Sequence, residues 1–347
     1  MKRIAFFISI CGIFLMMLTS CYSTKEITIQ VLHPPDKIVF NTPENLVLIN
    51  RMLRDPSLKD TLHFNDLKIP SKMYHDLEWK ALYGFADVAY GSPWVKNVFF
   101  DSVFVDSVSI KSKPMIISFS ERENMFKKDQ ARVGVDLAKI IFSDSIYRSR
   151  EFVYGDNPDD VEGAWLTVIN VDLFVKADWF IYEDNKPFPI DTTNHTNVLN
   201  LNGVGRSYHE AFANLPNIRE AIADLAYQAG QHHAYHIFPI WDEVSRIYFT
   251  NTMDQKMKEA EDLAQKNQWI NAAAIWRDIT LSKNKKKAAY AAFNMALASE
   301  ISDKLDLTES WLKRSLELHD SPITRNYLEI IRERLKDYKK MNLKTSE

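Results

Sequence analysis

The sequence predicts an α+β protein, with a mixed α/β region built on a largely antiparallel sheet and followed by an all-α region of helical repeats. Two observations lead to this order. Short β-rich runs alternate with helical spacings over residues 26–250, whereas from Met253 onward glycine is absent and helix formers dominate. A hydrophobic content of 46% and a charged content of 26% are ordinary for a globular protein.

The first twenty residues have the organisation of a secretory signal. A basic head, Met1–Arg3, precedes an apolar run that ends at Leu18 and is too short for a membrane span. Leu18-Thr19-Ser20-Cys21 then resembles a bacterial lipobox, in which the cysteine receives a diacylglyceryl group. The sequence contains two cysteines, and Cys11 lies in the removed segment, so Cys21 is the predicted lipidation site. An ordinary signal peptide with an incidental cysteine is the alternative.

The next region is predicted to hold short strands around one helix. Residues 21–25 are a predicted tether, and residues 52–72 a predicted loop. Apolar residues at helical spacing predict a helix over 73–90, which Gly91-Ser92-Pro93 ends. The predicted strands are residues 27–32, 46–51, 98–108 and 115–119, with a further strand around 139–142.

The clearest strand is Trp165–Ile181, where apolar and mostly polar residues alternate, as expected of a half-buried antiparallel strand. Tyr182–Pro187 is a predicted hairpin turn, with a return strand after Phe188. A helical segment over 207–235 is interrupted at Leu215-Pro216, and a strand-like pattern follows over 237–250. These elements complete the predicted domain, residues 26–250.

The C-terminal region, residues 251–347, contains a 36-residue repeat. Ala260, Asn267, Trp269, Ala272 and Trp276 correspond to Ala296, Asp303, Leu305, Thr308 and Leu312. The pattern resembles tetratricopeptide repeats, with Asn267 and Asp303 at the turn where glycine is usual. A last helix over 322–340 is predicted to cap the repeats. A generic helical bundle is the alternative.

Stacked helix pairs form a concave surface, and this surface is the predicted site for a protein or peptide partner. By analogy with such repeats, Tyr290, Phe293, Leu297 and Glu300 are the candidate groove residues. Core packing is the alternative role for Phe293 and Leu297.

Catalytic, cofactor and metal motifs are not found in the sequence. His232 and His236 share a helix face, but no HExxH motif or third ligand accompanies them, so no metal site is assigned. The nucleophile elbow GxSxG is absent, and Gly203-Val204-Gly205 lacks a third glycine. The net charge of −3 gives no basis for nucleic-acid binding.

Asp-Ser or Asp-Thr followed by an aliphatic residue or threonine occurs at Asp60, Asp101, Asp106, Asp144 and Asp191. The pattern resembles the O-glycosylation acceptor of exported Bacteroidetes proteins. The alternative is that these pairs serve ordinary turns.

Several blocks resemble an uncharacterised domain family of Bacteroidetes-type envelope lipoproteins. They are Leu46–Arg51, Leu173–Tyr182, Leu215-Pro216, Ala221–Gly230 and Ala234–Trp241. The resemblance implies an anchored α/β domain followed by tetratricopeptide-like helices, and it implies no activity.

Together these features predict a lipid-anchored, non-enzymatic lipoprotein that acts as a scaffold or protein-interaction module of the cell envelope. Tyr22, rather than aspartate, follows Cys21, which favours the outer membrane, on a face that the sequence does not indicate. One alternative is a glycan hydrolase-like envelope enzyme whose carboxylates come from distant strands. The other is a metal- or ligand-binding lipoprotein using His232 and His236.

Overall fold

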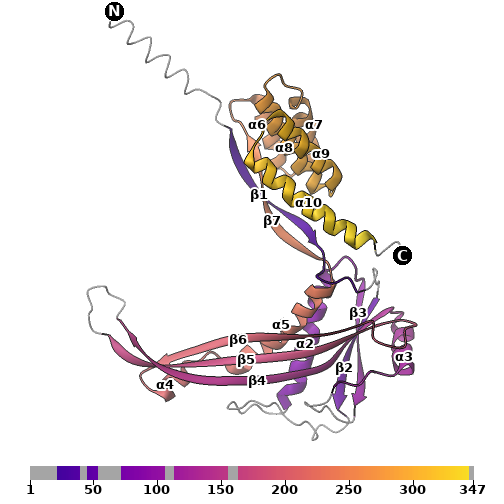
Figure 1. The fold of residues 1–347 in the computed structure, drawn as a ribbon, viewed down its shortest axis with the longest axis vertical. Helices are drawn as coiled ribbons and strands as arrows, with labels where there is room; N and C mark the ends of the chain where they lie inside the picture. The colour runs from indigo at the N-terminus through magenta and orange to yellow at the C-terminus, as the bar shows by residue number, and fades with distance from the viewer. Residues whose placement is uncertain (1–21, 40–44, 54–71, 106–112, 155–162, 344–347) are drawn as a thin grey trace, which may run out of the picture. The chain divides into compact units, whose positions relative to one another are not determined.

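The computed structural model describes residues 22–39, 45–53, 72–105, 113–154 and 163–343. The chain forms two compact units, one joining the chain up to His33 with Trp241–Ser346, and the other comprising Pro34–Ile240. We call them the ribbon–helix unit and the sheet unit. The predicted α+β class is confirmed, because a mixed sheet with flanking helices precedes a C-terminal helical region (Figure 1).

The sheet unit is built on five strands in the order β3-β2-β4-β5-β6. Their bounds are Asn45–Leu53 for β2, Asn97–Val105 for β3, Val133–Val153 for β4, Ala164–Glu183 for β5 and Asp191–Gly205 for β6. β2 lies parallel to β3 and β4, whereas β4, β5 and β6 are antiparallel and run side by side (Figure 1). The sheet is mixed, with antiparallel pairing in its longest strands.

The long hairpin follows its predicted alternation. In β5, the apolar set from Ile169 to Ile181 is buried, and Asn185 in the turn has a φ of 63°. β4 continues far beyond the short strand predicted around 139–142, because it pairs with β5 through to Val153. The second half of β4 is mostly exposed, which is why apolar content alone did not reveal it.

The predicted strand over 115–119 is wrong. The chain is irregular up to Ser118, and helix α3, Phe119–Asp129, begins there. The Ser118 side chain accepts a hydrogen bond from the Glu121 backbone N–H and the Glu121 carboxylate accepts one from that of Ser118, a capping box that favours helix. α3 covers one face of the sheet over a cluster that includes Val47, Ile49 and Tyr182.

The opposite face is covered by α2, Lys72–Gly91, α5, Ile218–Ile237, and the short α4, Tyr208–Ala213. The predicted helices over 73–90 and 207–235 are thus confirmed, the second with its interruption at Leu215-Pro216. α2 and α5 approach closely at glycines, since a Cβ added to Gly84 would lie 2.0 Å from the Tyr227 carbonyl oxygen. Most of the predicted 52–72 loop, residues 54–71, lies outside the described residues.

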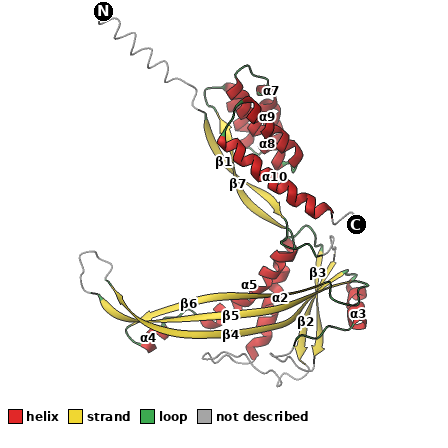
Figure 2. Ribbon diagram, viewed as in Figure 1, coloured by secondary structure: helices red, strands yellow, loops and turns green. Residues whose placement is uncertain are grey.

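The ribbon–helix unit begins with a two-stranded ribbon of β1, Ser23–His33, and β7, Ile240–Thr250 (Figure 2). The sequence grouped these segments with the preceding domain. In the structure they pair with each other, and Ile29, Val31 and Tyr248 join the core of the C-terminal helices. β1 also starts two residues after Cys21, within the predicted 21–25 tether.

The helices of this unit follow in antiparallel pairs. Their bounds are Gln255–Gln265 for α6, Trp269–Ile279 for α7, Lys285–Ile301 for α8, Leu305–Leu318 for α9 and Pro322–Leu343 for α10. Asn267 and Asp303 directly follow the C-caps of α6 and α8 with φ of 59° and 53°, which confirms the predicted turns. Among the described residues, no helix is both long and apolar enough to cross a membrane.

The groove and its polar network

The four predicted groove residues lie on α8 at positions i, i+3, i+7 and i+10, and therefore share one face of the helix. Phe293, Leu297 and Glu300 are buried, and Tyr290 is partly buried. Other helices and the β1–β7 ribbon of the same chain pack against α8 and cover these residues.

Strand β7 is held through its main chain by a side chain of α8. The backbone N–H of Phe249 donates to Asn294 Oδ1 at 2.8 Å, and Asn294 Nδ2 donates to the Phe249 carbonyl at 2.7 Å. Asn294 is fully buried, so both bonds are shielded from water. This two-bond arrangement fixes the register of an extended strand without depending on that strand's side chains.

Aromatic rings of the ribbon and of Tyr22 pack on the same face of α8. The Phe249 ring stacks on Tyr290 with a centroid separation of 3.9 Å and meets Phe293 edge-on at 4.9 Å. Tyr22, the residue after Cys21, packs edge-on against Tyr290 at 4.6 Å. Leu297 lies in the cluster that contains Ile29 and Val31 of β1. All three apolar candidates therefore contact or share a core with the ribbon.

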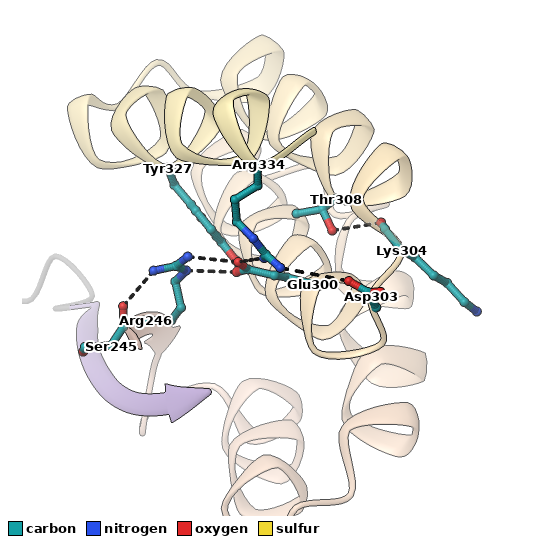
Figure 3. A network of polar contacts seen from close by, with 8 residues as sticks. All are labelled: Ser245, Arg246, Glu300, Asp303, Lys304, Thr308, Tyr327 and Arg334. Atoms are coloured by element: carbon teal, nitrogen blue, oxygen red, sulfur yellow. Dashed lines mark hydrogen bonds and ion pairs between the residues drawn. The ribbon is translucent and has the colours of Figure 1, made fainter. Parts of the chain in front are cut away.

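Glu300 is the centre of a buried polar network (Figure 3). Arg246 of β7 donates to it twice, from Nε to Oε2 and from Nη2 to Oε1, both at 3.0 Å. Tyr327 and Arg334 of α10 also donate to its carboxylate. The Glu300 side chain is 0% exposed, and Arg246 and Arg334 are 11% and 16% exposed.

The electrostatics of the network agree with its geometry. Burial lowers the pKa of Arg246, but the hydrogen bonds and charge of Glu300 outweigh that effect, and the pKa is raised overall. Burial and the adjacent Glu300 charge raise the pKa of the Tyr327 hydroxyl well above its usual value. The network therefore keeps Arg246 charged and Tyr327 protonated, so that both remain hydrogen-bond donors.

The repeat pattern indicated the groove residues on α8, but it did not indicate Asn294 and Arg246, which connect α8 to β7. The asparagine among the alanines of residues 288–298 was the available signal for Asn294. No local signal identified Arg246, since its partner lies 54 residues away.

Cys21 itself lies outside the described residues. The structure begins at Tyr22, and the Ser23 hydroxyl lies 2.8 Å from that of Thr250 at the end of β7. The residues next to the predicted lipidation site are thus already part of the ribbon.

His232 and His236 meet a third histidine that the sequence did not associate with them. The ring of His195, on β6, lies 4.7 Å from that of His232 and 5.2 Å from that of His236. Its Nε2 is 3.2 Å from Nδ1 of His233, which is fully buried and stacked on Trp179. Within the described residues, no group of three or more His, Cys, Asp or Glu side chains is arranged to hold a metal ion.

We expect this cluster to make the sheet unit sensitive to acid. Burial and the neighbouring histidines lower the pKa of His195 to about 4 and that of His233 well below 6.5. The unfolded chain therefore binds more protons than the folded one below about pH 6.5, and the free energy of unfolding falls as the pH drops toward 4. Urea denaturation at pH 7.5 and 4.5 measures this fall.

His233→Phe is the matched variant, because phenylalanine keeps a ring between Trp179 and Phe85 and removes the buried base. Between pH 7.5 and 4.5, we expect the free energy of unfolding to fall by about 1–2 kcal/mol less in His233→Phe than in the wild type. An equal loss in both proteins would contradict the assignment to His233.

Two carboxylate sites of the sheet unit have structural partners. Asp136, fully buried, accepts two hydrogen bonds from Arg51, at 3.1 and 2.6 Å, and one from Tyr182 at 3.4 Å. A surface hollow of about 360 Å³ holds Asp101, paired with Lys128, and Glu121 of the capping box. Of the five Asp-Ser/Thr pairs, those at Asp101, Asp144 and Asp191 lie in strands, and the other two lie outside the described residues.

Two family models match the chain. A domain of unknown function (DUF8603) matches residues 44–249, more than half of the sequence, and a domain of unknown function (DUF6340) matches residues 258–340. A search of the curated proteins found no match. Among solved structures, the chain is similar to a neuraminyllactose-binding hemagglutinin homolog from Helicobacter pylori, with 13% identity, 58% of this chain and 90% of that chain covered, and a TM-score of 0.24.

Proposed function

The chain belongs to the DUF8603 family of domains of unknown function, and we propose its role from the geometry of the chain itself. The protein is a lipid-anchored, non-enzymatic scaffold of the cell envelope, held at the outer membrane by acyl chains on Cys21. The observation that supports this is the position of the ribbon. β1 starts two residues after Cys21, and its partner β7 is fixed to α8 by Asn294 and Glu300.

In this proposal only a very short segment separates the lipid anchor from the ribbon. Two residues span at most about 7 Å, so the acyl chains would hold the ribbon close to the lipid surface. Tyr22 and Ser23 are themselves packed against Tyr290 and Thr250. Because Arg246 of β7 donates to Glu300, a force on the anchor would be transmitted through the ribbon to this buried network. Such a rigid attachment suits an anchored scaffold.

The filled groove limits where an external partner binds. A peptide at Tyr290, Phe293 or Asn294 would have to displace β7 and break its contacts with all three. We therefore propose that the groove holds the chain's own strand, and that a protein partner of the scaffold binds on surfaces outside the groove.

Lipidation has a direct test in the natively expressed protein. We expect its intact mass to show a chain beginning at Cys21 with acyl groups attached, and we expect the protein to sediment with membranes. Cys21→Ser should remove the acyl mass and release the protein from the membrane, since two or more acyl chains are needed for stable anchoring.

Cys11→Ser is the control, because Cys11 lies in the segment that the proposed cleavage removes, and it should leave both results unchanged. An unmodified Cys21 in the native protein would refute the anchor. Purification of the native protein in mild detergent tests the scaffold role, for which a stoichiometric protein partner is the expected result and a clean monomer the contrary one.

A further inference from the structure

Strand β6 forms one edge of the sheet and is long for an edge strand. It covers 15 residues, Asp191–Gly205, and pairs with β5 through a continuous register. No other strand within the described ranges pairs with its outer side. Its main-chain groups on that side are a template for another strand.

The usual protections of an exposed edge are missing here. From Thr192 to Gly205 the strand has no Lys, Arg, Asp, Glu or Pro, and its pairing with β5 contains no bulge. Both ends are closed, because the Thr192 N–H donates to the Asp191 carboxylate and Asn214 Nδ2 donates to the Val204 carbonyl at 2.9 Å. The open stretch therefore runs from Thr193 to Asn202.

The side chains on the open face of β6 are self-complementary. The face that carries Val198 is directed away from α5, and the exposed residues along it are Thr192, Asn194, Thr196, Val198, Asn200 and Asn202. If a second β6 is laid antiparallel with Val198 at the two-fold axis, Val198 faces Val198, Thr196 faces Asn200 and Asn194 faces Asn202. From Asn194 to Asn202 every polar side chain on this face meets a polar one, and no like charges oppose each other.

We propose that the β6 edge binds a second copy of this chain through antiparallel pairing centred on Val198, which joins two sheets into one. The two-fold axis satisfies the edges of both copies at once, as expected of an isologous interface. An unrelated extended strand would satisfy the main-chain groups equally, but only a second copy gives the Val198 self-contact. The pairing does not depend on the lipid anchor.

A single cysteine at the axis tests the pairing in the full chain. Residues directly opposite in antiparallel strands have Cβ atoms about 4.5–5.5 Å apart, close to disulfide geometry. In mildly oxidised Val198→Cys protein, we expect most of the chain to form a dimer whose disulfide maps to position 198 by peptide mass. Mapping separates this product from any linkage through Cys21.

Val204→Cys is the matched control, because it places a thiol on the same strand and face but opposite Thr192 in the proposed pairing. It should give little dimer. Adding Thr196→Lys and Asn200→Lys to Val198→Cys sets lysines opposite each other, and we expect the dimer yield to fall about tenfold. Equal yields from Val198→Cys and Val204→Cys, a Val198→Cys monomer, or a disulfide to another protein would each overturn the proposal.

Discussion

Glu300→Ala is expected to destabilise the ribbon–helix unit by about 3–5 kcal/mol. Removing the carboxylate leaves the mostly buried guanidinium of Arg246 without its bidentate partner and takes the shared acceptor from Tyr327 and Arg334. An unpaired buried charge carries its full desolvation penalty, which exceeds the loss of any single hydrogen bond. The ribbon should therefore separate from α8 more often, with the main chain of β7 exposed.

Hydrogen exchange measured by mass spectrometry distinguishes this from a general loss of stability. We expect exchange in β7 peptides covering Arg246–Thr250 to increase by at least tenfold, while peptides of β5 in the sheet unit keep wild-type rates. Glu309→Ala is the control, because Glu309 pairs with Lys313 and Arg332 near the surface and should lose about 1 kcal/mol or less. Wild-type exchange in β7 of Glu300→Ala would contradict the role assigned to the network.

Gly230→Ala is expected to destabilise the sheet unit by about 3 kcal/mol or more. A Cβ at Gly230 would lie 1.7 Å from the carbonyl oxygen of Ala81, and one at Gly84 would lie 2.0 Å from that of Tyr227. The obstructing atoms belong to the backbone of the facing helix, so α2 and α5 would have to move apart. Their shared core with β4 and β5 would then open.

Urea denaturation followed by far-UV circular dichroism measures the effect, with Gly84→Ala expected to behave alike. Gly91→Ala is the control, because Gly91 ends α2 and nothing lies within 4 Å of its added Cβ. Alanine there should be neutral or stabilising by about 0.5–1 kcal/mol, since it lowers the entropy of the unfolded chain. Similar midpoints for Gly230→Ala and Gly91→Ala would show that the helices tolerate separation.

Features with local causes could be predicted from the sequence. Residues a few positions apart account for the turns at Asn267 and Asp303, the hairpin turn with Asn185 and the helix break at Leu215-Pro216. The local sequence also contained a signal against the strand predicted over 115–119, because Ser118 and Glu121 have the spacing of a capping box, which indicates a helix start. The strand was predicted there from the β-branched residues instead.

The groove shows why the rest could not be predicted. The spacing of Tyr290, Phe293, Leu297 and Glu300 placed them on one face of a helix, but nothing in their pattern indicated which segment lies against them. The contact of Arg246 with Glu300 and the bonds of Asn294 with Phe249 connect different elements. His195 likewise meets His233 from another strand.

The sequence by itself determined the α+β order, the helical pairs and the candidate lipidation site at Cys21, because periodicity, turn residues and a lipobox are short-range patterns. Only the tertiary structure decided that β1 pairs with β7 across more than 200 residues, with Ser23 meeting Thr250, and that this ribbon packs on the α8 face that carries the predicted groove residues. Pairing between distant strands depends on the packing of all the elements together, and therefore it cannot be predicted from any single stretch of sequence.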